Sequence, residues 1–117
     1  MTTGKRILIV EDDTTLLEML SDQLQLHEEF STVGVTSAAE ALEQAKEDYF
    51  DVILLDVGLQ DMDGREVCRL MRRNGVISPI IMLTGADTDA AAHHDAVHQR
   101  DIGLREAADV GVEAVLL

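Results

Sequence analysis

The apolar residues of this chain follow two different spacings, and the alternation between them predicts its secondary structure. Short, nearly continuous apolar runs such as Arg6–Val10 (RILIV) are typical of strands that are buried on both faces. Longer stretches with apolar residues three or four positions apart, such as Thr14–Leu26, are typical of helices that bury one side. We expect strands at Arg6–Val10, Ser31–Val35, Val52–Leu55, Ile80–Leu83 and Val112–Leu117. We expect helices at Thr14–Leu26, at Ala38–Glu47, and from Gly64 to the pair Asn74 and Gly75.

Residues at the helix ends support these boundaries. Asp13 is suited to cap the first helix, and Ser37 with Glu40 three positions later forms a capping box for the second. Asn74 and Gly75 both tolerate a left-handed backbone and end the third helix. Strands and helices therefore alternate with short connections. This order predicts an α/β domain with a doubly wound, mostly parallel sheet and helices on both faces.

Composition and charge narrow the classes of function. A chain of 117 residues with 46% hydrophobic residues forms one globular domain. Its formal net charge of -14 disfavours binding to the phosphates of nucleic acids and to anionic membranes. No apolar run reaches the roughly 20 residues of a membrane span. Cys68 is the only cysteine, so no internal disulfide can form, and we interpret it as a half-buried structural thiol in a cytoplasmic protein.

Acidic and hydroxyl side chains follow three of the expected strands. Glu11 and Asp12 follow the first, Asp56 follows the third and Thr84 follows the fourth. Ligands of open parallel sheets bind beyond the carboxyl ends of the strands, so we expect these residues at one edge. Clustered carboxylates repel one another unless a cation offsets their charge, and an all-oxygen ligand set suits Mg²⁺. A carboxylate beside Mg²⁺ can accept a phosphoryl group, although each acid taken alone also suits helix capping.

Three motifs carry a resemblance to a known family. They are ILIVEDD (Ile7–Asp13), DVILLDVGLQDMDG (Asp51–Gly64) and PIIMLTG (Pro79–Gly85). In their order and spacing, the chain resembles the receiver domain of a bacterial two-component response regulator over residues 5–87. The resemblance implies a flavodoxin-like fold, a doubly wound parallel five-stranded sheet in three α/β/α layers, here lacking the last helix. It also implies a single receiver domain over residues 1–117, in which residues 88–117 are atypical or truncated.

The resemblance further implies a role for each site residue. Asp56 is the expected phosphoacceptor, which takes a phosphoryl group from a sensor histidine kinase. The expected Mg²⁺ ligands are Glu11, Asp12, Asp56 and the backbone carbonyl of Gly58. Thr84 is the expected switch hydroxyl, which moves toward the aspartyl phosphate and shifts a two-state equilibrium. Such a chain is not an enzyme beyond catalysing its own phosphorylation and dephosphorylation, and an effector domain or partner protein carries the output.

The chain departs from the family pattern at three places. Gln60 stands where the family usually has proline, so we expect a somewhat looser loop after the phosphoacceptor. The family's Lys-Pro pair at the end of the last strand is missing, and neither Lys5 nor Lys46 can fill its role. The stretch from Asp87 to Gly111 is longer than in the family. It is a natural variant, an engineered or fused tail, or the product of a shifted reading frame.

Two other functions and a second metal site remain as alternatives. An aspartyl-phosphate phosphatase usually has Asp-x-Asp, whereas Asp56 is followed two positions later by Gly58, which counts against that activity. A truncated or engineered receiver-like fragment would be a binding or homodimerisation module without phospho-switching, associating through the apolar strand Val112–Leu117. His94 and His98 share one face of an expected helix, but further Zn²⁺ ligands are not evident, so a solvent-facing helix is favoured.

Overall fold

A parallel sheet forms the centre of the protein. The computed structural model describes residues 4–83 in full and residues 114–116 as backbone. The strands in these ranges are β1 (Lys5–Val10), β2 (Phe30–Val35), β3 (Val52–Asp56), β4 (Ile80–Leu83) and β5 (Ala114–Leu116). They are hydrogen-bonded in the order β2-β1-β3-β4-β5, and every neighbouring pair is parallel. The parallel five-stranded sheet expected from the sequence is confirmed.

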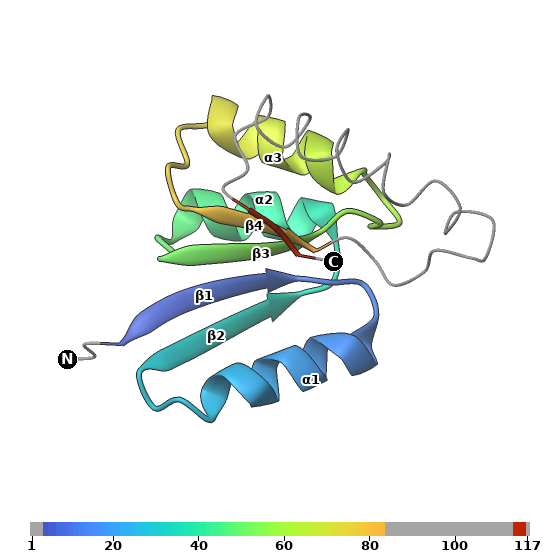
Figure 1. Cartoon of the computed structure of the whole chain (residues 1–117). Coiled ribbons are helices and arrows are strands. Elements are labelled where there is room, and N and C mark those ends of the chain that lie inside the picture. The colour runs from blue at the N-terminus through green and yellow to red at the C-terminus, as the bar shows by residue number, and fades with distance from the viewer. Residues whose placement is uncertain (1–3, 84–113, 117) are drawn as a thin grey trace.

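Helices cover both faces of this sheet, which gives three layers (Figure 1). The helix α1 (Thr14–Gln25) lies on one face, and α2 (Ala38–Glu47) and α3 (Gly64–Arg73) lie on the other. From β1 the chain first moves outward to the edge strand β2 and then returns past β1 to β3 and β4. The winding direction therefore reverses between β1 and β3. The carboxyl ends of these two strands form the switch point at which open α/β sheets bind ligands.

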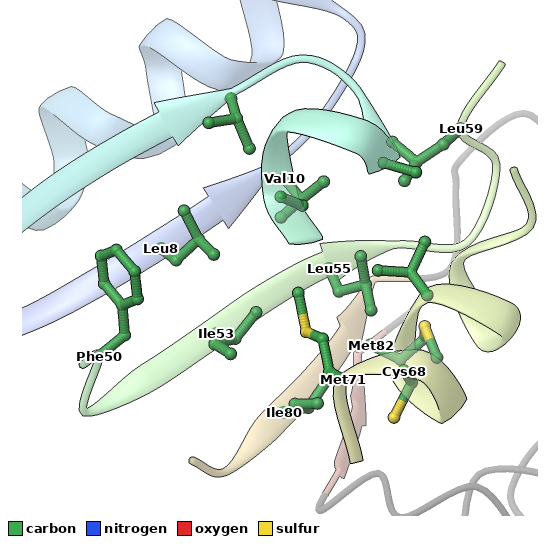
Figure 2. Packing of buried hydrophobic residues seen from close by; sticks show 14 residues of the cluster. Leu8, Val10, Phe50, Ile53, Leu55, Leu59, Cys68, Met71, Ile80 and Met82 are labelled. Atoms are coloured by element: carbon green, nitrogen blue, oxygen red, sulfur yellow. The ribbon is translucent and has the colours of Figure 1, made fainter. Parts of the chain in front are cut away.

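The strand β1 is buried on both faces, as its continuous apolar run predicts. Leu8 and Val10 pack into a large cluster under α2 and α3, whereas Ile7 and Ile9 pack on the α1 side. Burial of each such side chain stabilises the fold by about 1.5–3 kcal/mol, so β1 is held firmly between the two layers. Figure 2 also labels these members of the large cluster: Phe50, Ile53, Leu55, Leu59, Cys68, Met71, Ile80 and Met82.

The expected helix caps are present. The Asp13 side chain accepts hydrogen bonds from two amides in the first turn of α1, at 3.0 and 3.2 Å. The Ser37 hydroxyl accepts one from the amide of Glu40 at 3.2 Å and donates one to the Glu40 carboxylate, also at 3.2 Å. Gly75 follows the end of α3 with a φ of +89°, a left-handed conformation that favours glycine. These residues fix where each helix begins or ends.

Several element boundaries differ from the sequence-based expectation by one residue, whereas those of α2 and β4 match it. The strands β1 and β2 begin one residue earlier, at Lys5 and Phe30, because these two residues pair across the ladder. The strand β3 extends one residue further, to Asp56, which pairs with Leu83 of β4. Leu26 is the cap of α1 and no longer part of the helix. Periodicity reports which residues are apolar, whereas the ladder also includes polar residues at the strand ends.

Cys68 is fully buried, so the expectation of a half-buried thiol is wrong. Its exposed fraction is 0%, and it belongs to the large cluster that includes Met71, Ile80 and Met82. The reason is that the side of α3 that carries Cys68 packs against the sheet. The extent of that contact is a tertiary property that helical spacing does not report.

The C-terminal strand is the last described element. The strand β5 pairs with β4, with Ile81 opposite Ala114 and Leu83 opposite Leu116. Thr84 and the stretch from Asp87 to Gly111, with its histidines, lie outside the described residues, so the expectations about them stay predictions. Within the described ranges, no helix has the length and apolar character needed to cross a bilayer.

Candidate functional site

Three carboxylates meet where β1 and β3 end. Glu11 and Asp12 directly follow β1, and Asp56 is the last residue of β3. Because the two strands are parallel neighbours, their carboxyl ends lie side by side. One carboxylate oxygen from each of the three residues lies within 4.8 Å of the other two. The structure thus brings together the three acids to which the sequence assigns a cation.

Glu11 is the most constrained of these acids. It is only 5% exposed, and its amide donates to the carbonyl oxygen of Val35 at 3.1 Å, which fixes the backbone at the end of β1. Its Oε2 atom is buried without a hydrogen-bond partner among the described residues. Burial raises the pKa of Glu11 to about 8, and the hydrogen bond and charge of Asp56 and the charges of Asp12 and Asp13 act in the same direction. The site therefore holds an acid whose ionised form lacks compensation.

Asp56 is buried and oriented by its own backbone. Its exposed fraction is 7%, and the amide of Gly58 donates a hydrogen bond of 3.2 Å to Oδ1. The amide of Val57 donates to the carbonyl oxygen of Leu83 at 3.1 Å, so the chain stays attached to β4 after the strand ends. The family resemblance implies a ligand role for the carbonyl of Gly58, which stays a prediction. The structure adds a role for the amide of the same residue.

The loop between β3 and α3 is anchored at several points that the sequence analysis missed. Leu59 is 7% exposed and belongs to the large core cluster. The carboxylate of Asp61 accepts hydrogen bonds from the first amides of α2. Asp63 caps α3 by accepting from the amide of Arg65 at 2.8 Å. The Asp63 cap could have been found, since an acid just before a helix is a known signal, whereas the Asp61 contact joins distant parts of the sequence.

The two lysines of the chain lie away from this site. Lys5 begins β1, and Lys46 lies in the last turn of α2. Both are therefore at the amino ends of the strands, whereas Asp56 is at the carboxyl ends. A cleft of about 390 Å³ opens at the amino ends, and Lys46, Tyr49 and Ile77 are among the residues that line it. The cleft contains none of the three clustered carboxylates. We therefore locate the chemistry at the carboxyl edge.

The donor set at the carboxyl edge fits a hard cation. All three donors are carboxylate oxygens, which is the ligand type that Mg²⁺ and Ca²⁺ prefer in proteins. A bound cation would favour ionised Glu11 and would give its unpartnered Oε2 an electrostatic partner. Asp13 lies outside the cluster, and its side chain is used to cap α1. Glu11, Asp12 and Asp56 are thus the residues that could hold the metal.

Comparison with known proteins agrees with this geometry. The family model "Response regulator receiver domain" matches residues 7–103. The DNA-binding response regulator MtrA of Mycobacterium tuberculosis is 40% identical over 108 residues, which cover 92% of this chain and 43% of that protein. The alkaline phosphatase synthesis transcriptional regulatory protein PhoP of Bacillus subtilis is 34% identical over 86 residues, which cover 74% of this chain and 35% of that protein. The chain spans less than half the length of these relatives.

Solved structures show the same fold. The receiver domain of a Francisella response regulator superposes with a TM-score of 0.77 at 19% identity, covering 97% of this chain and 83% of that one. A CheY-like receiver domain protein from Methanospirillum hungatei gives a TM-score of 0.74 at 25% identity, covering 97% of this chain and 81% of that one. Receiver domains of this kind are signalling proteins of two-component systems and not enzymes in the ordinary sense. The chain therefore belongs to the family of response regulator receiver domains.

Proposed function

We propose that this chain accepts a phosphoryl group on Asp56 from a sensor histidine kinase, with Mg²⁺ held at the same edge of the sheet. One observation carries the proposal: three carboxylates have oxygens within 4.8 Å of one another, and one of these residues, Glu11, has a buried oxygen that finds no hydrogen-bond partner in the described part of the chain. Such an arrangement is costly for a fold unless a cation binds there. Glu11, Asp12, Asp56 and the backbone carbonyl of Gly58 would hold the metal.

The proposed reaction is a transfer between two side chains. A carboxylate oxygen of Asp56 attacks the phosphorus atom, the bond between phosphorus and the donor imidazole nitrogen breaks, and the imidazole takes up a proton. The product is an aspartyl phosphate. The amide of Gly58 holds Oδ1 of Asp56, which restricts the carboxylate to one orientation before attack.

The acids around Asp56 would hold the metal, whereas Asp56 also accepts the phosphoryl group. Mg²⁺, when bound, supplies positive charge that offsets the negative charge developing on the transferred phosphoryl group. Glu11 must be ionised to serve as a ligand, although its burial favours the protonated form. Metal binding should therefore release a proton from this site near neutral pH.

The output of the switch lies outside the described residues. We propose that the Thr84 hydroxyl hydrogen-bonds the phosphoryl group and couples it to the neighbouring strands. The chain spans less than half the length of its curated relatives. We propose that an effector domain or a separate partner carries the response. The net charge of -14 disfavours direct contact with nucleic acid or an anionic membrane by this part. Its single cysteine, which is buried, suits the reducing cytoplasm.

Intact mass spectrometry tests the proposal. The protein is incubated with Mg²⁺ and a small acyl-phosphate donor, alongside the variant Asp56→Asn and a sample treated with EDTA. The expected result is a mass gain of one phosphoryl group in the parent with Mg²⁺ only. If the folded, Mg²⁺-binding parent gains no mass, the phosphoacceptor proposal fails. The alternative of a binding or homodimerisation module would then take its place, and sedimentation would show whether the chain associates with itself.

A further inference from the structure

Asp61 connects the loop after the phosphoacceptor to a distant helix. Its Oδ1 accepts a hydrogen bond of 3.0 Å from the amide of Ala38, and its Oδ2 accepts one of 3.2 Å from the amide of Ala39. These amides are in the first turn of α2, 23 and 22 residues away in the sequence. A negative charge at a helix N-terminus is favourable, because the amides there have no partner within the helix. The pKa of Asp61 is lowered by the same two amides, first by that of Ala38.

The first turn of α2 therefore has two caps of different kinds. Ser37 is the local cap, and its hydroxyl accepts from the amide of Glu40 at 3.2 Å. Asp61 satisfies the two amides that precede Glu40, and it does so from another element. Ser37 alone satisfies only the Glu40 amide, one of the amides that have no partner within the helix. The second cap has a different consequence, because it fixes the position of the loop that supplies it.

The loop is short enough for this contact to reach the site. Two residues separate Asp61 from Gly58, whose amide holds Oδ1 of Asp56. Between them, Leu59 is buried beside α2 in the large core cluster (Figure 2). Gln60 is exposed and stands where the family usually has a proline. The loop thus lacks the constraint of a proline ring on its backbone and has instead an anchor on each side of Gln60.

We propose that Asp61 is a positioning residue for the phosphoacceptor site, because its bonds to α2 hold the loop at the place where Gly58 meets Asp56 and the metal. The inference rests on the proposed function, since it assumes that the loop is part of the cation site. It assigns Asp61 no contact with the metal or the phosphoryl group. Without the Asp61 side chain, the backbone of Gly58 samples more conformations. Mg²⁺ binding must then also order this backbone, which weakens the affinity for the metal.

The test compares two variants that each remove a cap of the same helical turn. Asp61→Ala removes the bonds to the loop, whereas Ser37→Ala removes the local cap and leaves both Asp61 bonds in place. Mg²⁺ affinity is measured by titration, and hydrogen exchange of the Gly58 and Leu59 amides is measured without metal. The Mg²⁺ titration is repeated in 1 M KCl, where the screening length is about 3 Å, so that the lost charge of Asp61 does not mimic lost positioning.

We expect Asp61→Ala to weaken Mg²⁺ binding about tenfold in both salt conditions and to speed exchange of the Gly58 amide. Ser37→Ala should lower the melting temperature but leave Mg²⁺ affinity and that amide unchanged. Asp61→Asn, which keeps one acceptor oxygen, should show a smaller loss and serves if the alanine variant does not fold. Equal Mg²⁺ affinity in the parent and a folded Asp61 variant, or a loss that vanishes in 1 M KCl, would overturn the inference.

The proposed function and this inference fail in different ways. A parent that gains no Asp56-dependent phosphoryl mass contradicts the proposed function, whatever Asp61 does. Hydrogen exchange at Gly58 requires neither metal nor donor, so it judges the anchoring of the loop independently. Unchanged exchange at Gly58 in Asp61→Ala would show that the α2 contact does not control the loop.

Discussion

The backbone of Gly64 lies directly against the backbone of Asp56. A Cβ atom at position 64 would overlap the carbonyl oxygen of Asp56 and would lie 2.9 Å from the Cα of Val57. The amide of Gly64 also donates to the carbonyl oxygen of Val57 at 2.9 Å. The start of α3 is thus pressed onto the end of β3, and only glycine permits this approach.

Replacement of this glycine should disturb both the fold and the site. We expect Gly64→Ala to lower the free energy of unfolding by about 2–3 kcal/mol, because the added methyl group meets backbone atoms that cannot rotate away. Chemical denaturation measures the change. Gly58→Ala is the matched control, because a Cβ there meets no atom within 4 Å and Gly58 has no positive φ. Its effect should stay within about 1 kcal/mol, and equal losses in the two variants would contradict the steric argument.

Removal of Asp12 should weaken the cation site without unfolding the protein. Asp12 is partly exposed and contributes one of the three clustered carboxylates. We expect Asp12→Ala to weaken Mg²⁺ binding by at least about tenfold, the loss that is common even for residues that only orient a metal ligand. Isothermal titration with MgCl₂ measures the affinity.

Its neighbour provides the control for charge. Asp13 is next in the sequence, but its side chain caps α1. Asp13→Ala should cost about 1 kcal/mol of stability. Asp13 contributes no oxygen to the carboxylate cluster and acts on it only through its charge, which salt weakens, so Asp13→Ala should change Mg²⁺ affinity much less than Asp12→Ala does. Unchanged Mg²⁺ affinity in Asp12→Ala would contradict the metal assignment.

The arrangement of elements could be predicted because it depends on local pattern. Strands buried on both faces need continuous apolar runs such as Ile7–Val10, and a helix on a sheet needs one apolar side. The order of these elements then restricts the topology, and the acids after β1 and β3 must meet at one edge. The convergence of Glu11, Asp12 and Asp56 follows from these rules.

Other features depend on contacts between distant residues, and the sequence has no signal for them. The bonds of Asp61 to α2 join positions 22 and 23 residues apart, and no periodicity marks such a pair. Glu11 and Asp12 are adjacent acids that look equivalent in the sequence. Only the structure shows that Glu11 is buried with an unpartnered oxygen and that Asp12 reaches solvent. The full burial of Cys68 likewise depends on how α3 packs onto the sheet.

The buried thiol gives a direct measure of local opening. Cys68 has an exposed fraction of 0%, and burial raises the pKa of its thiol, an effect that outweighs the opposite effect of the Arg72 and Arg69 charges. A thiol reagent at pH 8 should therefore react at least about a thousandfold more slowly with the folded protein than with the protein in urea. Glu43→Cys places a second thiol on the exposed side of α2. This thiol should react with the folded protein about as fast as a thiol of the unfolded protein does. Equal rates for the two thiols would contradict the packing of α3.

Glu11 should make the stability of the metal-free protein depend on pH. The pKa of its carboxyl rises from an ordinary 4.5 to about 8 on folding. Between these two values the folded state binds more protons than the unfolded state, so the free energy of unfolding decreases as the pH rises. The contribution of Glu11 is fully present below about pH 4.5 and is lost as the pH passes 8. Mg²⁺ should act in the opposite direction and stabilise the protein more at pH 8 than at pH 5, because it binds the ionised form.

Urea denaturation with EDTA at pH 5 and pH 8 measures this dependence, and Glu11→Gln isolates the contribution of the residue. The amide resembles the protonated acid in shape and does not titrate, so the variant should lose less stability than the parent between the two pH values. It should also lose the pH-dependent stabilisation by Mg²⁺. If parent and variant lose the same free energy of unfolding from pH 5 to pH 8, another group causes the pH dependence. Burial of the ionised Glu11 carboxylate would then not destabilise the fold.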